Sequence, residues 1–153
     1  MRLTIMLLVA AISFAGEMTE MKTVDVFHKQ RPPALKTLEQ VKPLLDKYQS
    51  EYNIVYHPIE SDSTQRFIEK FDLPETHFPF AVVIDGKMAA KIDDRDVLFF
   101  EFPVFMHGIG RHEGNWSLAD LETVLMDNSL LTDSITIPEH DHEQHEECEG
   151  NDG

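Results

Sequence analysis

Cysteine is nearly absent from this chain. Its single cysteine, Cys148, lies near the carboxyl end, so no internal disulfide can form and no thiol pair is present for dithiol exchange. Lys and Arg are also scarce, 13 against 28 Asp and Glu, which gives a formal net charge of -15. Phosphate backbones and anionic lipids attract an excess of cationic side chains. The composition therefore predicts no nucleic-acid partner and favours cationic, neutral or metallic partners.

Long apolar runs are confined to the amino terminus. Arg2 supplies a positive charge, residues 3–14 are almost wholly apolar, and Ser13 and Ala15 place small residues where a signal peptidase reads the chain. We expect a signal peptide over 1–15, a periplasmic or extracellular mature protein, and no stable membrane insertion after cleavage. The run is short for a permanent span of ~30 Å of hydrocarbon. An uncleaved anchor and a buried amino-terminal element remain the alternatives.

The apolar pattern beyond the signal segment predicts one domain over 16–134, since 153 residues with 42% hydrophobic content are too few for two ordinary domains. β-branched and aromatic residues cluster in four predicted strands, 23–27, 53–58, 80–84 and 88–92. The dipeptide Asp85-Gly86 predicts a two-residue hairpin between the last two.

Three helices are predicted between and after these strands. The first follows the break at Pro32-Pro33, the second begins at a cap on Ser63 or Thr64, and the third begins at a capping box on Ser117. The predicted order is βαβαββα. It describes an α/β domain.

This order resembles the thioredoxin-like family at three places in register. They are the strand Val24-Asp25-Val26-Phe27, the proline Pro43 inside the first long helix, and Phe78-Pro79-Phe80 leading to the Asp85-Gly86 hairpin. The resemblance implies a thioredoxin-like three-layer sandwich with an aromatic and Gly-rich insertion before the last helix. It also implies a cis bond before Pro79, beside which the backbone pairs with an extended peptide.

The chain departs from that family at the loop that carries the redox cysteines. Counting back from Pro43 puts the two cysteines at Leu35 and Leu38, whereas counting forward from the first strand puts them at Arg31 and Ala34. Neither count finds a thiol, and no other catalytic constellation is visible, so we do not expect an enzyme. We expect instead a redox-inactive module that binds a protein or peptide partner. Its predicted binding residues are Phe78, Pro79, Phe80, His28 and Arg31.

The insertion between 98 and 116 combines aromatic residues with three glycines. It predicts a binding loop in which His and Glu side chains hold a metal and an indole forms an apolar wall. The alternative is that Phe99, Phe102 and Phe105 extend the core and that the histidines make ordinary hydrogen bonds. The candidate loop residues are His107, Arg111, His112, Glu113 and Trp116.

The carboxyl-terminal segment over 135–153 is acidic, without apolar periodicity, and is predicted to be disordered. Imidazole and thiolate groups are ligands that suit Zn, Cu or Ni. The segment therefore predicts, as a second function, a periplasmic protein that binds or delivers a divalent metal. The alternative is a solvating tail whose histidines are incidental. The candidate metal ligands are His140, His142, His145 and Cys148.

Overall fold

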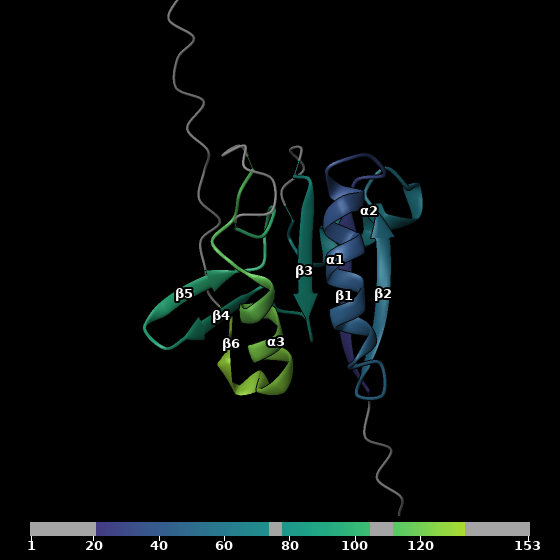
Figure 1. Cartoon of the computed structure of the whole chain (residues 1–153). Helices are drawn as coiled ribbons and strands as arrows, with labels where there is room; N and C mark the ends of the chain where they lie inside the picture. The colour runs from purple at the N-terminus through teal and green to yellow at the C-terminus, as the bar shows by residue number, and fades with distance from the viewer. Residues whose placement is uncertain (1–20, 74–77, 105–111, 134–153) are drawn as a thin grey trace, which may run out of the picture.

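The computed structural model describes residues 21–73, 78–104 and 112–133 (Figure 1). The chain has the α/β organisation that the sequence predicts, with three α-helices and two small sheets in the described part. The predicted signal peptide and the tail over 135–153 lie outside the described residues. In the part that is described, no helix is long and apolar enough to cross a membrane. The elements in chain order are β1 (Lys22–His28), α1 (Ala34–Asp46), β2 (Tyr52–Pro58), α2 (Asp62–Lys70), β3 (Phe80–Ile84), β4 (Ala89–Ile92), β5 (Arg95–Leu98), α3 (Leu118–Met126), the 3-10 turn η1 (Asn128–Leu130) and β6 (Leu131–Thr132).

The first sheet has the strand order β2-β1-β3. Strand β1 runs parallel to β2, with Val24 opposite Ile54, and antiparallel to β3, with Val26 opposite Val82. A parallel pair needs a crossover connection, and α1 supplies it. The β-branched segments that the sequence marks as strands thus form the centre of the domain.

The two faces of this sheet pack against different helices. Side chains of even-numbered residues in β1 and β3 share one cluster with apolar residues of α1 and α3. Odd-numbered side chains, including Phe27 and Val83, share a second cluster with Ile68 of α2. Because successive side chains of a strand point to opposite faces, the alternation separates the two cores. The sheet is a middle layer, with α1 and α3 on one side and α2 on the other (Figure 1).

The starts of the helices confirm the predictions in part. The capping box of α3 is present, since the Ser117 hydroxyl accepts from the Asp120 N–H and the Asp120 carboxylate accepts from the Ser117 N–H. Helix α2 begins earlier than predicted, with its cap at Ser61 rather than at Ser63 or Thr64. The Thr64 N–H already donates to the Ser61 carbonyl at 2.8 Å, so Thr64 belongs to the first turn.

The Asp85-Gly86 turn is confirmed, but the strands around it belong to different sheets. Ile84 and Lys87 exchange two backbone hydrogen bonds of 2.7 and 2.9 Å, and both turn residues have positive φ. Beyond Lys87 the chain turns away from β3. Strand β4 pairs instead with β5 and β6 in a second sheet of order β5-β4-β6. The sequence did not predict β5, which is short and begins with the exposed Arg95 and Asp96, or β6, which has two residues.

The aromatic segment takes the place beside β3 that β4 was expected to occupy. The Val82 N–H donates to the Phe99 carbonyl at 2.9 Å, and Ala81 bridges Phe100. Phe99 and Phe102 lie in the core with α1 and α3, and Phe100 lies in the core with α2. Core extension is therefore the correct interpretation of Phe99 and Phe102, and Phe100, which was not predicted to extend the core, does so as well. Phe105 lies outside the described residues.

The expected cis bond before Pro79 is wrong. The Phe78–Pro79 bond is trans, and the cis bond among the described residues is Pro32–Pro33. The Pro79 carbonyl accepts from the Lys29 N–H at 3.1 Å, which continues the ladder between β1 and β3 by one step. Because the Phe78–Pro79 bond is trans, the cis geometry implied by the family resemblance is absent at Pro79.

Candidate functional site

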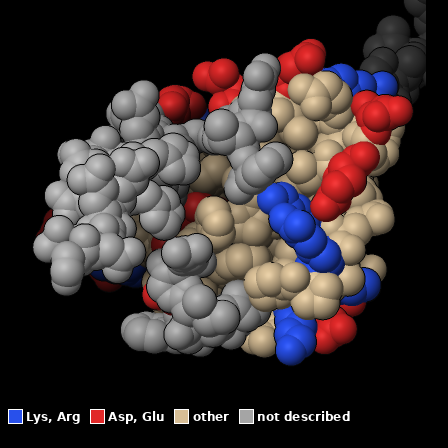
Figure 2. Space-filling view, turned by 90° about the horizontal axis from the view of Figure 1, so that it is seen from above, with Lys and Arg blue, Asp and Glu red and all other residues tan. Residues whose placement is uncertain are grey.

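The parallel strands β1 and β2 end side by side, and α1 begins at the same end of the molecule. The Ile59 N–H donates to the His28 carbonyl at 2.9 Å, which holds the two strand ends together. Ligand sites of open α/β sheets lie outside the carboxyl ends of parallel strands. Figure 2 looks down on this end and shows Lys or Arg atoms next to Asp or Glu atoms, with uncharged residues around them and further charged side chains toward the rim. The loop over 29–33 is therefore the first candidate for a ligand site.

Lys29 is a cation in a desolvated position. Its residue is 9% exposed, and within the described parts of the chain its ammonium group makes no ion pair or hydrogen bond. Burial lowers the pKa of Lys29, and the neighbouring Arg31 guanidinium lowers it further, while Glu60 acts in the opposite direction. The backbone of Lys29 is fixed by its bond to Pro79. Two cations thus lie close together in a protein of formal net charge -15.

The amino terminus of α1 adds to this positive potential. No side chain caps the helix, and its first turn contains no acidic residue. The Leu35 N–H donates to the Arg31 carbonyl at 3.3 Å, so the loop and the first helical turn are continuous. Unsatisfied N–H groups and the helix dipole favour an anion at such a terminus. The Arg31 side chain is exposed beside it.

An internal carboxylate already approaches the loop. The Gln30 N–H donates to the two oxygens of Glu60 at 3.1 and 3.3 Å. Both residues are exposed, so water competes for this bond. The bond to Glu60 shows that the backbone of this loop can donate to a carboxylate. The charge of Glu60 also offsets part of the charge of Lys29.

Behind the loop, the strands hold a buried acid and a buried imidazole. His57 Nε2 lies 2.7 Å from Asp25 Oδ1, and both residues are less than 10% exposed. The imidazole stacks on Phe27 at 4.8 Å between ring centroids and contacts Phe67 at 4.4 Å. The Asp in an apolar strand was the signal in the sequence. Its partner became identifiable only from the register of β1 against β2.

The predicted peptide-binding residues do not form an open surface. Phe78 and Phe80 are buried against Phe100 and Trp116 respectively, and Pro79 is buried with its carbonyl already bonded. His28 is also buried, and its Nδ1 lies 3.3 Å from the Lys29 carbonyl. Strand β3 pairs with β1 along its length and with the aromatic segment at Ala81 and Val82, so those backbone groups are already bonded on both sides. Of the five predicted residues, Arg31 is the exposed one.

The candidate loop site is described only in part, because His107 and Arg111 lie outside the described residues. His112 Nδ1 lies 3.1 Å from Glu101 Oε1, and the Glu101 side chain is buried. Trp116 is buried and its Nε1–H is shared between the carbonyls of Phe100 and Glu101, at 3.2 Å each. It therefore belongs to the core and forms no wall of a loop site.

Metal ligation falls largely on residues that the structure does not describe. His140, His142, His145 and Cys148 all lie there, so their predicted role stays a prediction. Within 21–73, 78–104 and 112–133, no group of three or more His, Cys, Asp or Glu side chains is arranged to hold a metal ion. Glu113 is exposed and is not part of such a group.

No protein-family model matches this chain, and no similar protein is found among curated proteins or solved structures. The functional argument therefore rests on the residues of the chain itself.

Proposed function

We propose that this chain is an exported, redox-inactive domain with a thioredoxin-like core, which binds a protein or peptide partner through a carboxylate of that partner. The fold part of the proposal is supported by the sheet order β2-β1-β3, with one parallel and one antiparallel pair. It is also supported by the three layers, with α1 and α3 opposite α2. The second sheet and the trans Pro79 bond depart from the family pattern.

The loop chemistry supports the absence of redox activity. Residues 29–33 read Lys-Gln-Arg-Pro-Pro and connect β1 to α1, where the family resemblance implies the thiol pair. A disulfide exchange needs an attacking thiolate and a second thiol, and this loop supplies neither. Binding rather than electron transfer is the chemistry that these side chains allow.

The burial of Lys29, whose ammonium group makes no ion pair or hydrogen bond among the described residues, is the observation that carries the binding proposal. Burying a charge without a partner costs free energy, and a carboxylate brought by a ligand removes that cost. Arg31 adds a planar donor for the same carboxylate, and the uncapped terminus of α1 adds N–H groups. Because the formal net charge is -15, anions are repelled elsewhere on the chain, which makes this position selective.

The internal carboxylate suggests how a partner is recognised. Glu60 occupies the Gln30 N–H in the free protein. A carboxylate of the partner competes with Glu60 for this loop, so binding exchanges one acidic group for another. The partner must therefore offer further contacts, as an extended acidic peptide does and a free acetate ion does not.

Mapping by NMR with a defined probe tests the proposal. We expect a pentaglutamate peptide added to the full chain to shift the backbone amides around the loop and the start of α1, which are those of Lys29, Gln30, Arg31, Ala34, Leu35 and Glu60. Pentaglutamine of the same length, with both peptides acetylated and amidated at their ends so that they differ only in the side-chain carboxylates, is the control and should leave them unchanged. Shifts spread over the whole surface, or none at this loop, would overturn the carboxylate site.

A further inference from the structure

Strand β2 is an unprotected edge. Within the described residues it pairs with β1 alone, and Figure 1 places it at the margin of the sheet. Its seven residues, Tyr52–Pro58, include no Lys, Arg, Asp or Glu, and Ile54, Val55 and Tyr56 are partly exposed. Natural edge strands are usually protected by charge, by covering segments or by short length. The uncharged edge of β2 is therefore suited to pair with a strand of another chain.

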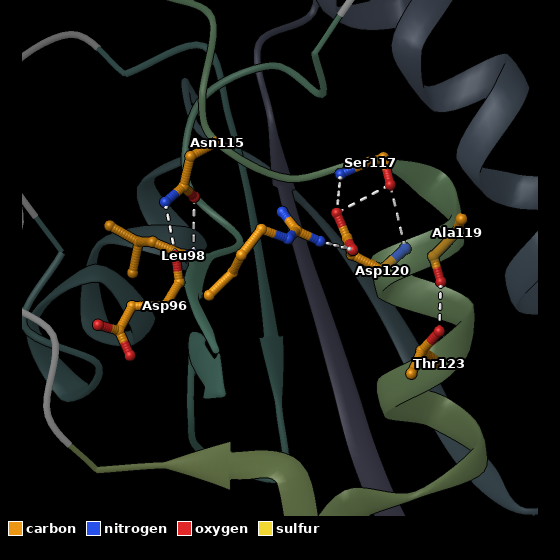
Figure 3. A network of polar contacts seen from close by, with 8 residues as sticks. Asp96, Leu98, Asn115, Ser117, Ala119, Asp120 and Thr123 are labelled. Atoms are coloured by element: carbon orange, nitrogen blue, oxygen red, sulfur yellow. Dashed lines mark hydrogen bonds and ion pairs between the residues drawn. The ribbon is translucent and has the colours of Figure 1, made fainter. Parts of the chain in front are cut away.

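Two other strand margins in the described part of the chain are covered. The aromatic segment covers β3, as described above. Strand β5 is charged and is capped by Asn115, whose Oδ1 accepts from the Leu98 N–H and whose Nδ2 donates to the Asp96 carbonyl, both at 2.9 Å (Figure 3). In Figure 3 the loop that carries Asn115 leads directly to the capping box of α3. The edge of β2 differs from these two margins because no described segment covers it.

The backbone groups left free on β2 form a short, defined set. The bond from Ile59 to the His28 carbonyl shows that odd-numbered residues of β2 face β1, so even-numbered residues face outward. The outward-facing Tyr52 N–H donates to the Tyr48 carbonyl at 3.0 Å. At the other end, Pro58 has no N–H, and its carbonyl accepts from Ser61 at 3.0 Å. Of the described residues in this strand, Ile54 and Tyr56 are left with both backbone groups unpaired.

This set is self-complementary. We propose that β2 pairs antiparallel with β2 of a second copy of the chain, about a two-fold axis at Val55. That register places Ile54 opposite Tyr56 of the second copy, and the reverse, so two residue pairs exchange four hydrogen bonds. No N–H or C=O that is already bonded has to be released. The interface is isologous, as a closed dimer requires, and it does not involve the carboxylate site.

The charges on α1 fit the same axis. Helix α1 runs antiparallel to β2, and Lys42 lies 5.9 Å from the Tyr56 ring centroid and pairs with Asp46 at 2.9 Å. Four helical residues rise about 6 Å and two strand residues about 6.6 Å, so Asp46 lies level with Ile54. The two-fold axis therefore sets Lys42 opposite Asp46 of the second copy. Both side chains are exposed, so in the dimer each can exchange its partner in the same chain for the one in the second copy.

Substitution at the axis tests the proposal, because Val55 faces its own copy there. We expect the full chain to have twice the monomer mass in sedimentation equilibrium, and Val55→Lys to raise the dimer dissociation constant about tenfold or more. Mixing Val55→Lys with Val55→Glu should restore dimers, as heterodimers. Asp94→Asn makes the same change of net charge at the exposed turn between β4 and β5 and should leave the dimer unchanged.

Amide hydrogen exchange tests the proposed hydrogen bonds between the two β2 strands directly. The amides of Ile54 and Tyr56 should lose protection on dilution or in Val55→Lys, whereas those of Val55 and His57, which face β1, should keep it. A wild-type chain that stays monomeric overturns the proposal and leaves the edge to a strand of another protein. A dimer that Val55→Lys does not weaken, or a mixture that fails to pair, overturns it equally. Unchanged far-ultraviolet circular dichroism of Val55→Lys shows that the loss of dimer is not unfolding.

Discussion

His57 Nε2 lies 2.7 Å from Asp25 Oδ1 across the parallel pair of β1 and β2, and both side chains are buried. The imidazole is held between Phe27 and Phe67, so it has little freedom to find another partner. Each polar side chain satisfies the other in a place that water does not reach. The pair therefore links the two strands whose ends carry the candidate site.

The first prediction is that this pair is energetically coupled. Asp25→Leu or His57→Leu alone leaves one buried polar group without its bond, which should cost about 1–3 kcal/mol of unfolding free energy. In the double variant the loss should fall short of the sum by about 0.5–3 kcal/mol. Urea unfolding at fixed protein concentration measures the unfolding free energy of the wild-type chain, the two single variants and the double variant. Additive effects would show that the 2.7 Å contact contributes no coupling.

The second prediction contrasts the buried Tyr52 with the partly exposed Tyr56. The Tyr52 hydroxyl donates to the Leu125 carbonyl at 2.8 Å and accepts from Asn128 at 2.6 Å, whereas the Tyr56 hydroxyl is buried with no partner among the described residues. Tyr52→Phe should therefore cost about 0.5–1.5 kcal/mol, and Tyr56→Phe should be neutral or stabilising. Thermal unfolding of the two variants checks the order. Equal losses would contradict it.

The same tyrosines predict a fall in stability at alkaline pH. Burial raises the pKa of Tyr52 and of Tyr56 above the ordinary value of 10.0. The neutral phenol is favoured in the folded state, so this stabilisation is complete below the unfolded-state pKa and is lost as the pH rises through the folded-state value. In Tyr52→Phe the unfolding free energy should decline less steeply above pH 10 than in the wild-type chain. Identical slopes would show that Tyr52 does not contribute.

The short-range features of this fold were readable from the sequence. The capping box at Ser117 and the turn at Asp85-Gly86 depend on residues within a few positions of each other, and both are present. The extent of α1 also follows from its own periodicity. These features were predictable because neighbouring residues alone determine them.

Long-range pairing was not readable. The Met88–Ile92 segment has the pattern of a strand that returns along β3, yet the aromatic segment around Phe99 pairs there instead. Two apolar segments competed for one edge, and packing of the phenyl rings in both cores decided between them. The burial of Lys29 and the pairing of Asp25 with His57 depend likewise on tertiary contacts. The sequence could mark these residues only as polar groups near apolar strands.

A further prediction concerns the acidic tail. Deleting residues 139–153 should abolish stoichiometric binding of Zn, Cu or Ni while the domain stays folded, because the tail has no apolar face. If the insertion between 98 and 116 holds the metal instead, binding should survive the deletion and disappear in the double variant His107→Ala/His112→Ala. Calorimetry at neutral pH separates the two, and acidification to about pH 5 should weaken either site by protonating imidazole. Binding unaffected by both changes would contradict both assignments.

The most direct test of the central claim measures pentaglutamate affinity and stability in the same set of variants. The folded-state pKa of Lys29 lies below its unfolded value, so at neutral pH its burial costs stability. That cost begins to fall as the pH passes the lowered folded-state pKa and is gone above the unfolded-state pKa. Lys29→Met should therefore raise the thermal midpoint at pH 7 and weaken pentaglutamate binding about tenfold or more, while Glu60→Gln should strengthen binding. Lys22→Met, which removes an exposed cation at the opposite end of β1, should change neither property. Equal affinities for Lys29→Met and Lys22→Met would contradict a carboxylate site at the end of the parallel strands.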